Sequence, residues 1–342
     1  MSLAIQLAER GVIPDALIRY GIRRLLRQRL AQESERYADS DALAQFVGRM
    51  CTCPIAVATE AANQQHYEVP SRYFETVLGS RLKYSCALFP PGVQDLDQAE
   101  SQMLGLCSER ARLADGQEIL ELGCGWGSLT LWMAQHYPAS QITAVSNSTG
   151  QRHFIETRAR QLGLRNVHVI TEDINTFDPG KQFDRVVSVE MFEHTRNHKL
   201  LFERIAGWLN PNGLLFFHIF CHREFAYFFE DSGEDDWMAR EFFTGGMMPS
   251  WDLPTQFQDS LALVSRWQVP GTHYAETCRQ WLARHDKNRK GILKLFTSKD
   301  APAGPEVMFQ RWRLFYLACE ALFDYDGGNE WYVGHYLFRP CK

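Results

Sequence analysis

The chain has 342 residues, of which 45% are hydrophobic and 23% charged, and its formal net charge is -5 at pH 7. These values are ordinary for a folded globular protein and give no electrostatic reason to expect nucleic acid or an anionic membrane as the main partner. No apolar run approaches the roughly 20 residues that span a bilayer. No apolar leader with a small-residue cleavage site opens the sequence. We therefore expect a cytoplasmic protein without a membrane-inserted segment.

The nine cysteines are an odd number, scattered along a chain long enough to fold without disulfides. Cys51 and Cys53 form an isolated Cys-x-Cys pair, whereas a zinc site needs about four ligands at suitable spacing. We expect reduced thiols and no metal site.

Residues 1 to 95 are predicted to form a helical N-terminal extension. Between residues 13 and 35 apolar side chains recur near helical spacing, and arginines occupy much of the remaining face. A basic face of this kind is typical of a solvated helix and also of a helix that lies on a membrane surface. The sequence leaves both interpretations open.

From residue 96 to 221 short apolar strands alternate with helices. The candidate strands are QEILELG, QITAVSNS, NVHVITED, FDRVVSVE and LLFFHIF. Strands that alternate with helices form βαβ units, so this region predicts an α/β fold with a doubly wound, mostly parallel sheet.

Residues 222 to 300 interrupt this alternation, and we expect an inserted aromatic lid there. The stretch HREFAYFFEDSGEDDWMAREFF is too aromatic for a linker and too irregular for another βα unit. Closely interleaved acids and rings are found in solvated loops and also in lids that attract a cation by cation–π contact. These acids are Glu230, Asp231, Glu234, Asp235 and Asp236. Residues 301 to 342 are expected to complete the sheet, because the tail EWYVGHYLFRP reads as a strand.

The stretch ILELGCGWGSLTL places Gly123, Gly125 and Gly127 between a strand and a helix. Glycines let the backbone turn sharply and approach a ligand where a Cβ would clash. A dinucleotide site needs Gly-x-Gly-x-x-Gly and an acid after the second strand, but here the third glycine comes early and that strand ends in AVSNS. The third strand ends in an acid beside an apolar residue. Such a pair suits the adenine of a nucleoside ligand that has no pyrophosphate. The pattern favours S-adenosylmethionine over NAD.

The stretch VEMFEH, residues 189 to 194, sets two acids and a histidine directly after an apolar strand. Burying such groups costs several kcal/mol unless they are paired or functional. The carboxyl ends of parallel strands are where functional side chains meet a cofactor. The structural alternatives are an acid at a helix N-terminus for Glu193 and a satisfied buried imidazole for His194.

Four stretches, LKYSC, ILELGCGWGSLTL, DRVVSVEMFEH and LLFFHIF, resemble the family of cyclopropane-fatty-acid synthases and plant coclaurine N-methyltransferases. The resemblance covers nearly the whole chain and is closer to the coclaurine-type branch in IFCHREFAYFFEDSGEDDW and FDYDGGNEWYVGHYLF. It implies a Rossmann-like class I methyltransferase that uses S-adenosyl-L-methionine as methyl donor. The implied cofactor contacts are Tyr84, Ser85, Glu121, Gly123, Gly125, Gly127, Asn147, Gln151, Asp173 and Ile174.

The same resemblance implies roles for the VEMFEH residues. In coclaurine-type enzymes the pair matching Glu193 and His194 acts on the substrate amine, whereas in cyclopropane synthases the matching glutamate helps to hold a bicarbonate that serves as base. Glu190 favours an amine, because the lipid branch carries a small residue there, as in VGMFEH. A supporting acid on the cofactor side is the alternative for Glu190.

Other positions resemble the lipid branch. Cys86, His218 and Tyr274 match residues that surround the bicarbonate of cyclopropane synthases, although a buried small hydrophobe is the simpler interpretation of Cys86. We place these three and Trp237 on the substrate side of the site. The resemblance is therefore mixed with respect to the methyl acceptor.

We expect a methyltransferase that N-methylates an amine of a small molecule by SN2 transfer, with Glu193 and His194 binding and deprotonating the amine and Glu190 in support. The alternative is methylation or cyclopropanation of an unsaturated acyl chain. A silent adenosyl-binding module is disfavoured because the acids and the histidine are intact. The sequence leaves open the acceptor, the number of methyl groups and the oligomeric state, a homodimer included.

Overall fold

A computed structural model of the protein describes residues 3–57, 69–230, 233, 236–297 and 303–341. Its centre is a seven-stranded sheet in the order β3-β2-β1-β4-β5-β9-β8. β1 to β5 run parallel, whereas β9 lies antiparallel between β5 and β8. The strands are β1 (Glu118–Leu122), β2 (Gln141–Ser146), β3 (Val167–Thr171), β4 (Phe183–Val189), β5 (Leu209–His222), β8 (Leu261–Val269) and β9 (Trp331–Pro340). The predicted doubly wound, mostly parallel sheet is confirmed.

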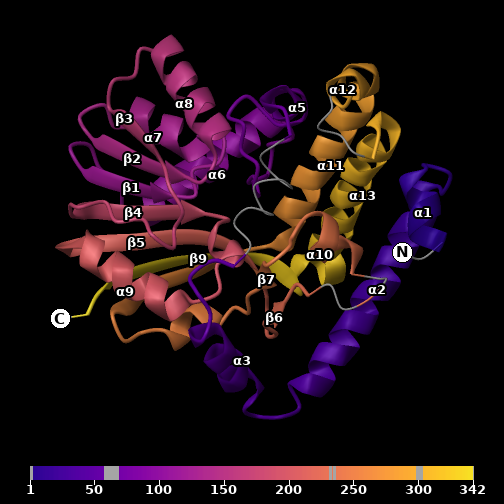
Figure 1. The fold of residues 1–342 in the computed structure, drawn as a ribbon, viewed down its shortest axis with the longest axis horizontal. Coiled ribbons are helices and arrows are strands. Elements are labelled where there is room, and N and C mark those ends of the chain that lie inside the picture. The colour runs from indigo at the N-terminus through magenta and orange to yellow at the C-terminus, as the bar shows by residue number, and fades with distance from the viewer. Residues whose placement is uncertain (1–2, 58–68, 231–232, 234–235, 298–302, 342) are drawn as a thin grey trace.

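Helices cover both faces of the sheet because alternate residues of each buried strand point to opposite sides. In β1, Ile119 packs in one apolar cluster with α6 and α7, while Leu120 and Leu122 pack in the other with α9. Figure 1 shows α7 and α8 on one side of the sheet and α9 on the other. These helices are α6 (Leu96–Arg110), α7 (Ser128–His136), α8 (Thr149–Gln161) and α9 (His198–Trp208).

A second group of helices stands beside the sheet, where α11 packs on α13 and α2 runs along α13 (Figure 1). The helices outside the sheet layers are α1 (Leu3–Glu9), α2 (Asp15–Arg36), α3 (Ala42–Cys51), α5 (Ser71–Val77), α10 (Trp237–Glu241), α11 (Gly271–Lys287), α12 (Arg289–Leu295) and α13 (Pro305–Phe323). Short elements complete the described chain: the strand pair β6 (Tyr227–Phe228) and β7 (Met247–Met248), and the 3-10 turns η1 (Phe192–His194), η2 (Leu253–Gln256) and η3 (Tyr325–Gly328).

The predicted ranges and the observed packing differ at two places. β8 lies inside the range 222–300, predicted as a lid, yet it is an edge strand of the sheet. α13 lies inside the range 301–342, predicted to complete the sheet, yet only β9 of that range does so. α13 instead packs on α2 and α11, because its apolar and aromatic residues recur at helical spacing and need a helical partner.

The arginine face of α2 is largely an intramolecular ion-pair surface. Arg19 lies 2.7 Å from Glu320 and Arg23 lies 3.3 Å from Asp324, both acids being at the end of α13 or just after it. Arg29 pairs with Asp236 at 3.2 Å. Arg24 and Arg27 are exposed, so the rest of this face is solvated. Among the described helices, none combines the length and the apolar character needed to cross a bilayer.

Candidate active site

The glycine turn joins β1 to α7 with all three glycines at positive φ, a region that side chains with a Cβ seldom adopt. A Cβ on Gly127 would lie 2.6 Å from Ile155 Cγ1 of α8, so this glycine permits close helix packing. A Cβ on Gly125 would meet nothing within 4 Å, and Gly125 lines the central cavity together with Gly123. Of the three predicted glycines, two face the cavity and Gly127 supports the turn.

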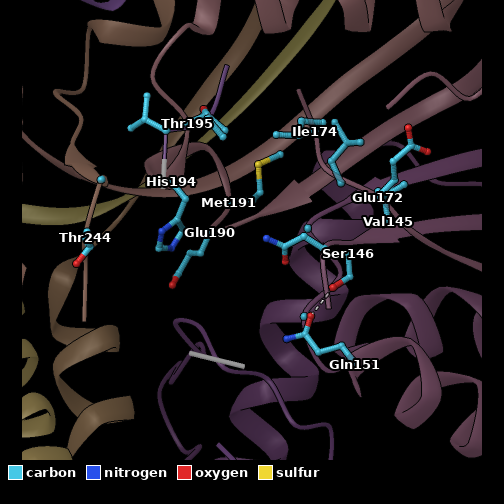
Figure 2. Close-up of a pocket in the computed structure, with 17 residues that line it drawn as sticks. Val145, Ser146, Gln151, Glu172, Ile174, Glu190, Met191, His194, Thr195 and Thr244 are labelled. Carbon is cyan, nitrogen blue, oxygen red and sulfur yellow. Dashed lines mark hydrogen bonds between the residues drawn. The ribbon is translucent and has the colours of Figure 1, made fainter. Parts of the chain in front are cut away.

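One end of the cavity is built by the ends of β2 and β3 and by the first turn of α8. Ser146, Asn147 and Gln151 line it, and Ser146 Oγ donates to Gln151 Oε1 at 2.6 Å (Figure 2). Asn147 and Gln151, both among the implied cofactor contacts, therefore come together at this end of the cavity.

The adenine side of the cavity differs from the prediction in one residue. Ile174 lines it, but the acid beside it is Glu172, whereas Asp173 is not among the lining residues. Asp173 Oδ1 accepts a hydrogen bond from the Asn175 backbone N–H at 2.8 Å and thereby closes the turn after β3. Because Glu172 and Asp173 are adjacent acids, the sequence pattern could not distinguish which one faces the cavity.

The other end of the cavity is lined by Tyr84, Ser85 and Glu121, as predicted, and by Lys83, which we did not predict. Lys83 Nζ donates to Cys86 O at 2.8 Å and is fully buried, so it fixes the LKYSC segment against the sheet. Burial raises the pKa of Glu121 to about 8, and Thr130 donates a hydrogen bond to its carboxylate.

Unsatisfied buried groups in this cavity test whether a nucleoside cofactor fits. Trp126 Nε1, Ser128 Oγ and Gln151 Nε2 are buried without a partner among the described residues, and all three residues line the cavity. Buried polar groups are rarely left unpaired. Three such groups around a glycine turn, together with an acid at the end of β1, fit a ligand with ribose hydroxyls and an amino group, such as S-adenosylmethionine.

Glu190 is held in place by three donors from three separate segments. The Cys86 backbone N–H and His218 Nε2 lie 3.0 Å and 3.1 Å from Glu190 Oε1. The Tyr274 hydroxyl donates to Oε2 at 2.6 Å. Burial raises the pKa of Glu190, while the charge of Lys83 and the hydrogen bonds from Tyr274 and the Cys86 backbone oppose that rise.

Cys86, His218 and Tyr274 therefore converge on one carboxylate that the chain itself supplies. The resemblance places these positions around a bicarbonate, and here all three contact Glu190. Of the three, Tyr274 lines the cavity, whereas Cys86 and His218 lie behind Glu190. The features that looked mixed in the sequence form a single cluster in the structure.

Glu193 and His194 do not share a surface. His194 lines the cavity beside Glu190 (Figure 2), and burial lowers its pKa to about 4, so the imidazole is neutral near pH 7. Glu193 is fully buried, is not among the lining residues, and accepts the Phe220 backbone N–H at 2.8 Å. Burial and the neighbouring charge of Glu190 raise the pKa of Glu193 well above its usual range. Glu190 therefore lines the cavity beside His194, whereas Glu193 does not, and the roles that we assigned to the two acids stay predictions.

Aromatic rings form part of the cavity wall, together with Glu190 and His194. The rings are Phe220, Phe243, Tyr274, Trp281 and Phe315. Phe243 also stacks on His194 with ring centroids 5.8 Å apart. Aside from Tyr274, sequence reasoning did not assign these rings to the site, since aromatic residues at helical spacing in α11 and α13 look the same as those of any buried helix.

The predicted lid residues lie elsewhere. Trp237 is buried in the core, where its Nε1 donates to Glu9 Oε1 at 2.9 Å, and it is not among the lining residues. Glu230 and Asp236 pair with arginines of α3 and α2 and do not line the cavity. Asp231, Glu234 and Asp235 lie outside the described residues. Of the range 222–300 that we predicted as a lid, the residues that line the cavity are Phe243, Thr244, Gly245, Tyr274 and Trp281.

Comparison with known proteins agrees with this geometry. Residues 57–330 match the family of mycolic acid cyclopropane synthetase. An (S)-coclaurine N-methyltransferase of Thalictrum flavum subsp. glaucum is 39% identical over 97% of this chain and 93% of its own length. The cyclopropane-fatty-acyl-phospholipid synthase of Escherichia coli K12 is 29% identical over 65% of this chain and 55% of its own.

A solved structure resembles the whole molecule. The crystal structure of a coclaurine N-methyltransferase bound to N-methylheliamine and SAH has a TM-score of 0.92 at 35% identity, covering 98% of both chains. The cyclopropane synthase MmaA2 of Mycobacterium tuberculosis shares the fold, with a TM-score of 0.70 at 20% identity over 83% of this chain and 99% of its own. The chain belongs to the mycolic acid cyclopropane synthetase family and is an S-adenosylmethionine-dependent methyltransferase.

Proposed function

We propose that this enzyme N-methylates an amine of a small molecule that carries an aromatic ring. The observation that carries the proposal is the Glu190 carboxylate, set beside a neutral His194 in a cavity that aromatic rings also line. A carboxylate attracts a protonated amine, and an aromatic wall binds both an aryl group and a cation. The relatives named as N-methyltransferases, at up to 39% identity, support this choice of acceptor.

The proposed mechanism divides the work between two side chains. When bound, S-adenosylmethionine supplies an electrophilic methyl group on a sulfonium. Glu190 binds the ammonium form of the acceptor and takes up its proton, which frees the nitrogen lone pair. His194 is neutral near pH 7 and accepts or donates a hydrogen bond that orients the nitrogen. The aromatic wall excludes water and holds the acceptor in line, which carries much of the rate of an SN2 reaction.

Glu193 has a positioning role in this proposal. Its carboxyl fixes the backbone of Phe220, and Phe220 forms part of the cavity wall. A neutral Glu193 leaves the negative charge on Glu190, because two adjacent buried carboxylates do not both ionise. We therefore assign amine binding and deprotonation to Glu190 and His194, and the support of the wall to Glu193.

The second candidate is methylation of an unsaturated acyl chain, which the more distant lipid relatives suggest. A carboxylate beside an alkene has no positive charge to bind. The three donors that would have to hold a free bicarbonate in such a reaction are already bonded to Glu190. The described cavity therefore favours an amine.

A product assay decides between the two. The enzyme is offered a panel of benzylic and phenethyl amines with methyl-labelled S-adenosylmethionine, without lipid or bicarbonate, and we expect labelled N-methyl amine and S-adenosylhomocysteine. Glu190→Gln and His194→Ala should each lower kcat/KM by about 100-fold or more while the cofactor Kd stays within about twofold. Turnover only with vesicles of unsaturated phospholipid would overturn the proposal.

A further inference from the structure

A chain of buried polar side chains leads from Glu190 along one face of the sheet to α6. His218 of β5 lies with Nε2 at 3.1 Å from Glu190 Oε1, and its Nδ1 lies 3.0 Å from Nε2 of His335 on β9. His335 Nδ1 in turn lies 2.8 Å from a guanidinium nitrogen of Arg110, at the end of α6. Both histidines are fully buried, while Arg110 is partly exposed and stacks over Trp267.

The cluster also contains a thiol, so a metal ion is the first alternative. Cys107, His218 and His335 offer ligand atoms within 4.8 Å of one another. However, both ring nitrogens of each histidine are already hydrogen-bonded, and the fixed positive charge of Arg110 lies against His335. Burial raises the pKa of the Cys107 thiol to about 11, which keeps it protonated. This chemistry suits a hydrogen-bond chain rather than a cation site.

The direction of the chain follows from one residue. An arginine only donates hydrogen bonds, so His335 Nδ1 must be the acceptor and the proton of that neutral ring must sit on Nε2. His335 Nε2–H then donates to His218 Nδ1, which places the proton of His218 on Nε2, facing Glu190. Burial lowers the pKa of both histidines well below the usual range, in agreement with two neutral rings.

We propose that Arg110 and His335 are positioning residues that act through His218, fixing its tautomer so that it always presents an N–H to the Glu190 carboxylate. The inference rests on the proposed function of Glu190 as the group that binds and deprotonates the acceptor. This hydrogen-bond chain stabilises the ionised carboxylate of Glu190, which accepts the N–H of His218. Neither Arg110 nor His335 lines the cavity, so neither touches a substrate.

The fixed direction of these hydrogen bonds also excludes one route for the proton that Glu190 takes from the amine. His218 Nε2 already carries a proton, and at the other end Arg110 has no lone pair to receive one. The chain therefore cannot conduct a proton from Glu190 to the surface. The proton remains on the cavity side until the product leaves or water enters.

Two variants at His335 separate positioning from packing. In His335→Leu the donor to His218 is lost, so His218 can turn its lone pair toward Glu190 and favour the protonated carboxyl. We expect the acid limb of the kcat/KM profile to move up by roughly one pH unit, so that activity at pH values on that limb falls by up to about tenfold. His335→Gln keeps an N–H at the position of Nε2 and should restore most of the activity.

The pH profile must be interpreted with the other groups around Glu190 in mind. The ionisable groups that face it from packed elements are Lys83, Cys86, Cys107, Glu193, His194, His218, Tyr274 and Cys278. All of them are present in both His335 variants, so a difference between these variants reports the donor alone. An equal loss in the Leu and Gln variants, with no shift of the acid limb, would overturn the proposal.

A matched arginine pair gives a second test. Arg110→Met should shift the acid limb in the same direction as His335→Leu, because the tautomer is no longer fixed. Arg81 also stacks over a tryptophan, Trp132, at 5.3 Å from the ring and is only partly exposed, but it bonds to Gln135 instead of a histidine. Arg81→Met should leave the pH profile unchanged, and a shift of equal size in both variants would contradict the proposal.

A measurement independent of turnover separates this inference from the proposed function. Imidazole nitrogen-15 chemical shifts of the wild-type protein identify the tautomer of each histidine, and we expect protons on Nε2 of both His218 and His335. A proton on Nδ1 of either ring, or a cationic ring, would overturn the chain even if amines are methylated. The expected tautomers without amine methylation would instead reject the role assigned to Glu190.

Discussion

Glu190 carries its carboxylate at a backbone position that most side chains avoid, with φ at +49°. A non-glycine residue there stores about 1 kcal/mol or more of strain, which the surrounding contacts must offset. The three hydrogen bonds to its carboxylate provide that compensation. The strained backbone therefore directs the Glu190 side chain toward these three hydrogen-bond donors.

Replacing Glu190 by glycine should remove the strain and leave the donors of Cys86, His218 and Tyr274 around an open space. We expect kcat/KM to fall about 100-fold or more, with part of the activity restored by acetate or bicarbonate in a saturable manner. The measurement is the initial rate against anion concentration at constant ionic strength. Glu190→Gln is the control, since it keeps the volume filled and should show no rescue. Equal rescue of both variants would contradict the idea of an anion cradle.

Gly125 offers a second prediction at this scale. An alanine there would adopt φ near +51° and project its methyl group into open cavity space, so the cofactor meets the methyl group while the protein does not. We expect Gly125→Ala to weaken S-adenosylhomocysteine binding roughly tenfold or more by calorimetry, where 1.4 kcal/mol corresponds to tenfold. Gly163 has φ +72° and equally open space but lies outside the cavity. Gly163→Ala should cost similar stability and leave binding unchanged.

At the scale of elements, one arginine joins three helices. Arg313 of α13 donates to both carboxylate oxygens of Asp15, at the start of α2, and of Asp286, near the end of α11. α13 also supplies Phe315 to the cavity, and α11 supplies Tyr274 and Trp281. The pairing therefore fixes the helices that carry the aromatic wall.

Arg313→Met should lower the free energy of unfolding by roughly 1–2 kcal/mol, since the arginine is only 16% exposed but its acids remain partly hydrated. Urea denaturation measures the change. The control is Arg289→Met, because Arg289 forms an ion pair with Glu306 in which both partners are well exposed. It should change stability by no more than about 0.5 kcal/mol, and equal losses in the two variants would refute the distinction.

The elements that the sequence predicts well are those with a strong local pattern. The parallel strands, the glycine turn and the placement of Glu190 and His194 at a strand end follow from hydrophobic runs and chain order. The contacts that define the site have no local signal: Cys86 and Glu190 are 104 residues apart, and Arg110 and His335 are 225 apart. The choice between Glu190 and Glu193 depends on a local backbone turn, which a sequence pattern of acids does not reveal.

At the scale of the whole molecule, several histidines are buried as neutral rings. His285 is fully buried, bonded to Tyr73 and to the carbonyl of Phe309, and burial lowers its pKa from 6.5 to about 3. The unfolded chain binds a proton near pH 6.5, whereas the native state does not until about pH 3. Stability from this group is therefore present above pH 6.5 and is lost as the pH falls toward 3.

His285→Gln should remove this pH dependence. Between pH 7 and pH 5 the wild-type protein loses about 2 kcal/mol through this one group, so the variant's loss over the same interval should be smaller by about that amount. Urea denaturation at the two pH values measures it. The exposed His153→Gln variant is the control and should follow the wild type. A wild-type slope in the His285 variant would show that other groups dominate acid unfolding.

The position of β9 also matters for how a new copy of the enzyme matures. β9 follows every other described strand and helix in chain order, yet it lies between β5 and β8 in the sheet. Chains fold from the N-terminus as they are synthesised, so one edge of β5 stays unpaired until the ribosome has made the other described strands and helices. His335 arrives on that same strand. Maturation of the sheet and completion of the hydrogen-bond chain behind Glu190 thus coincide, which makes an interrupted translation product both aggregation-prone and catalytically incompetent.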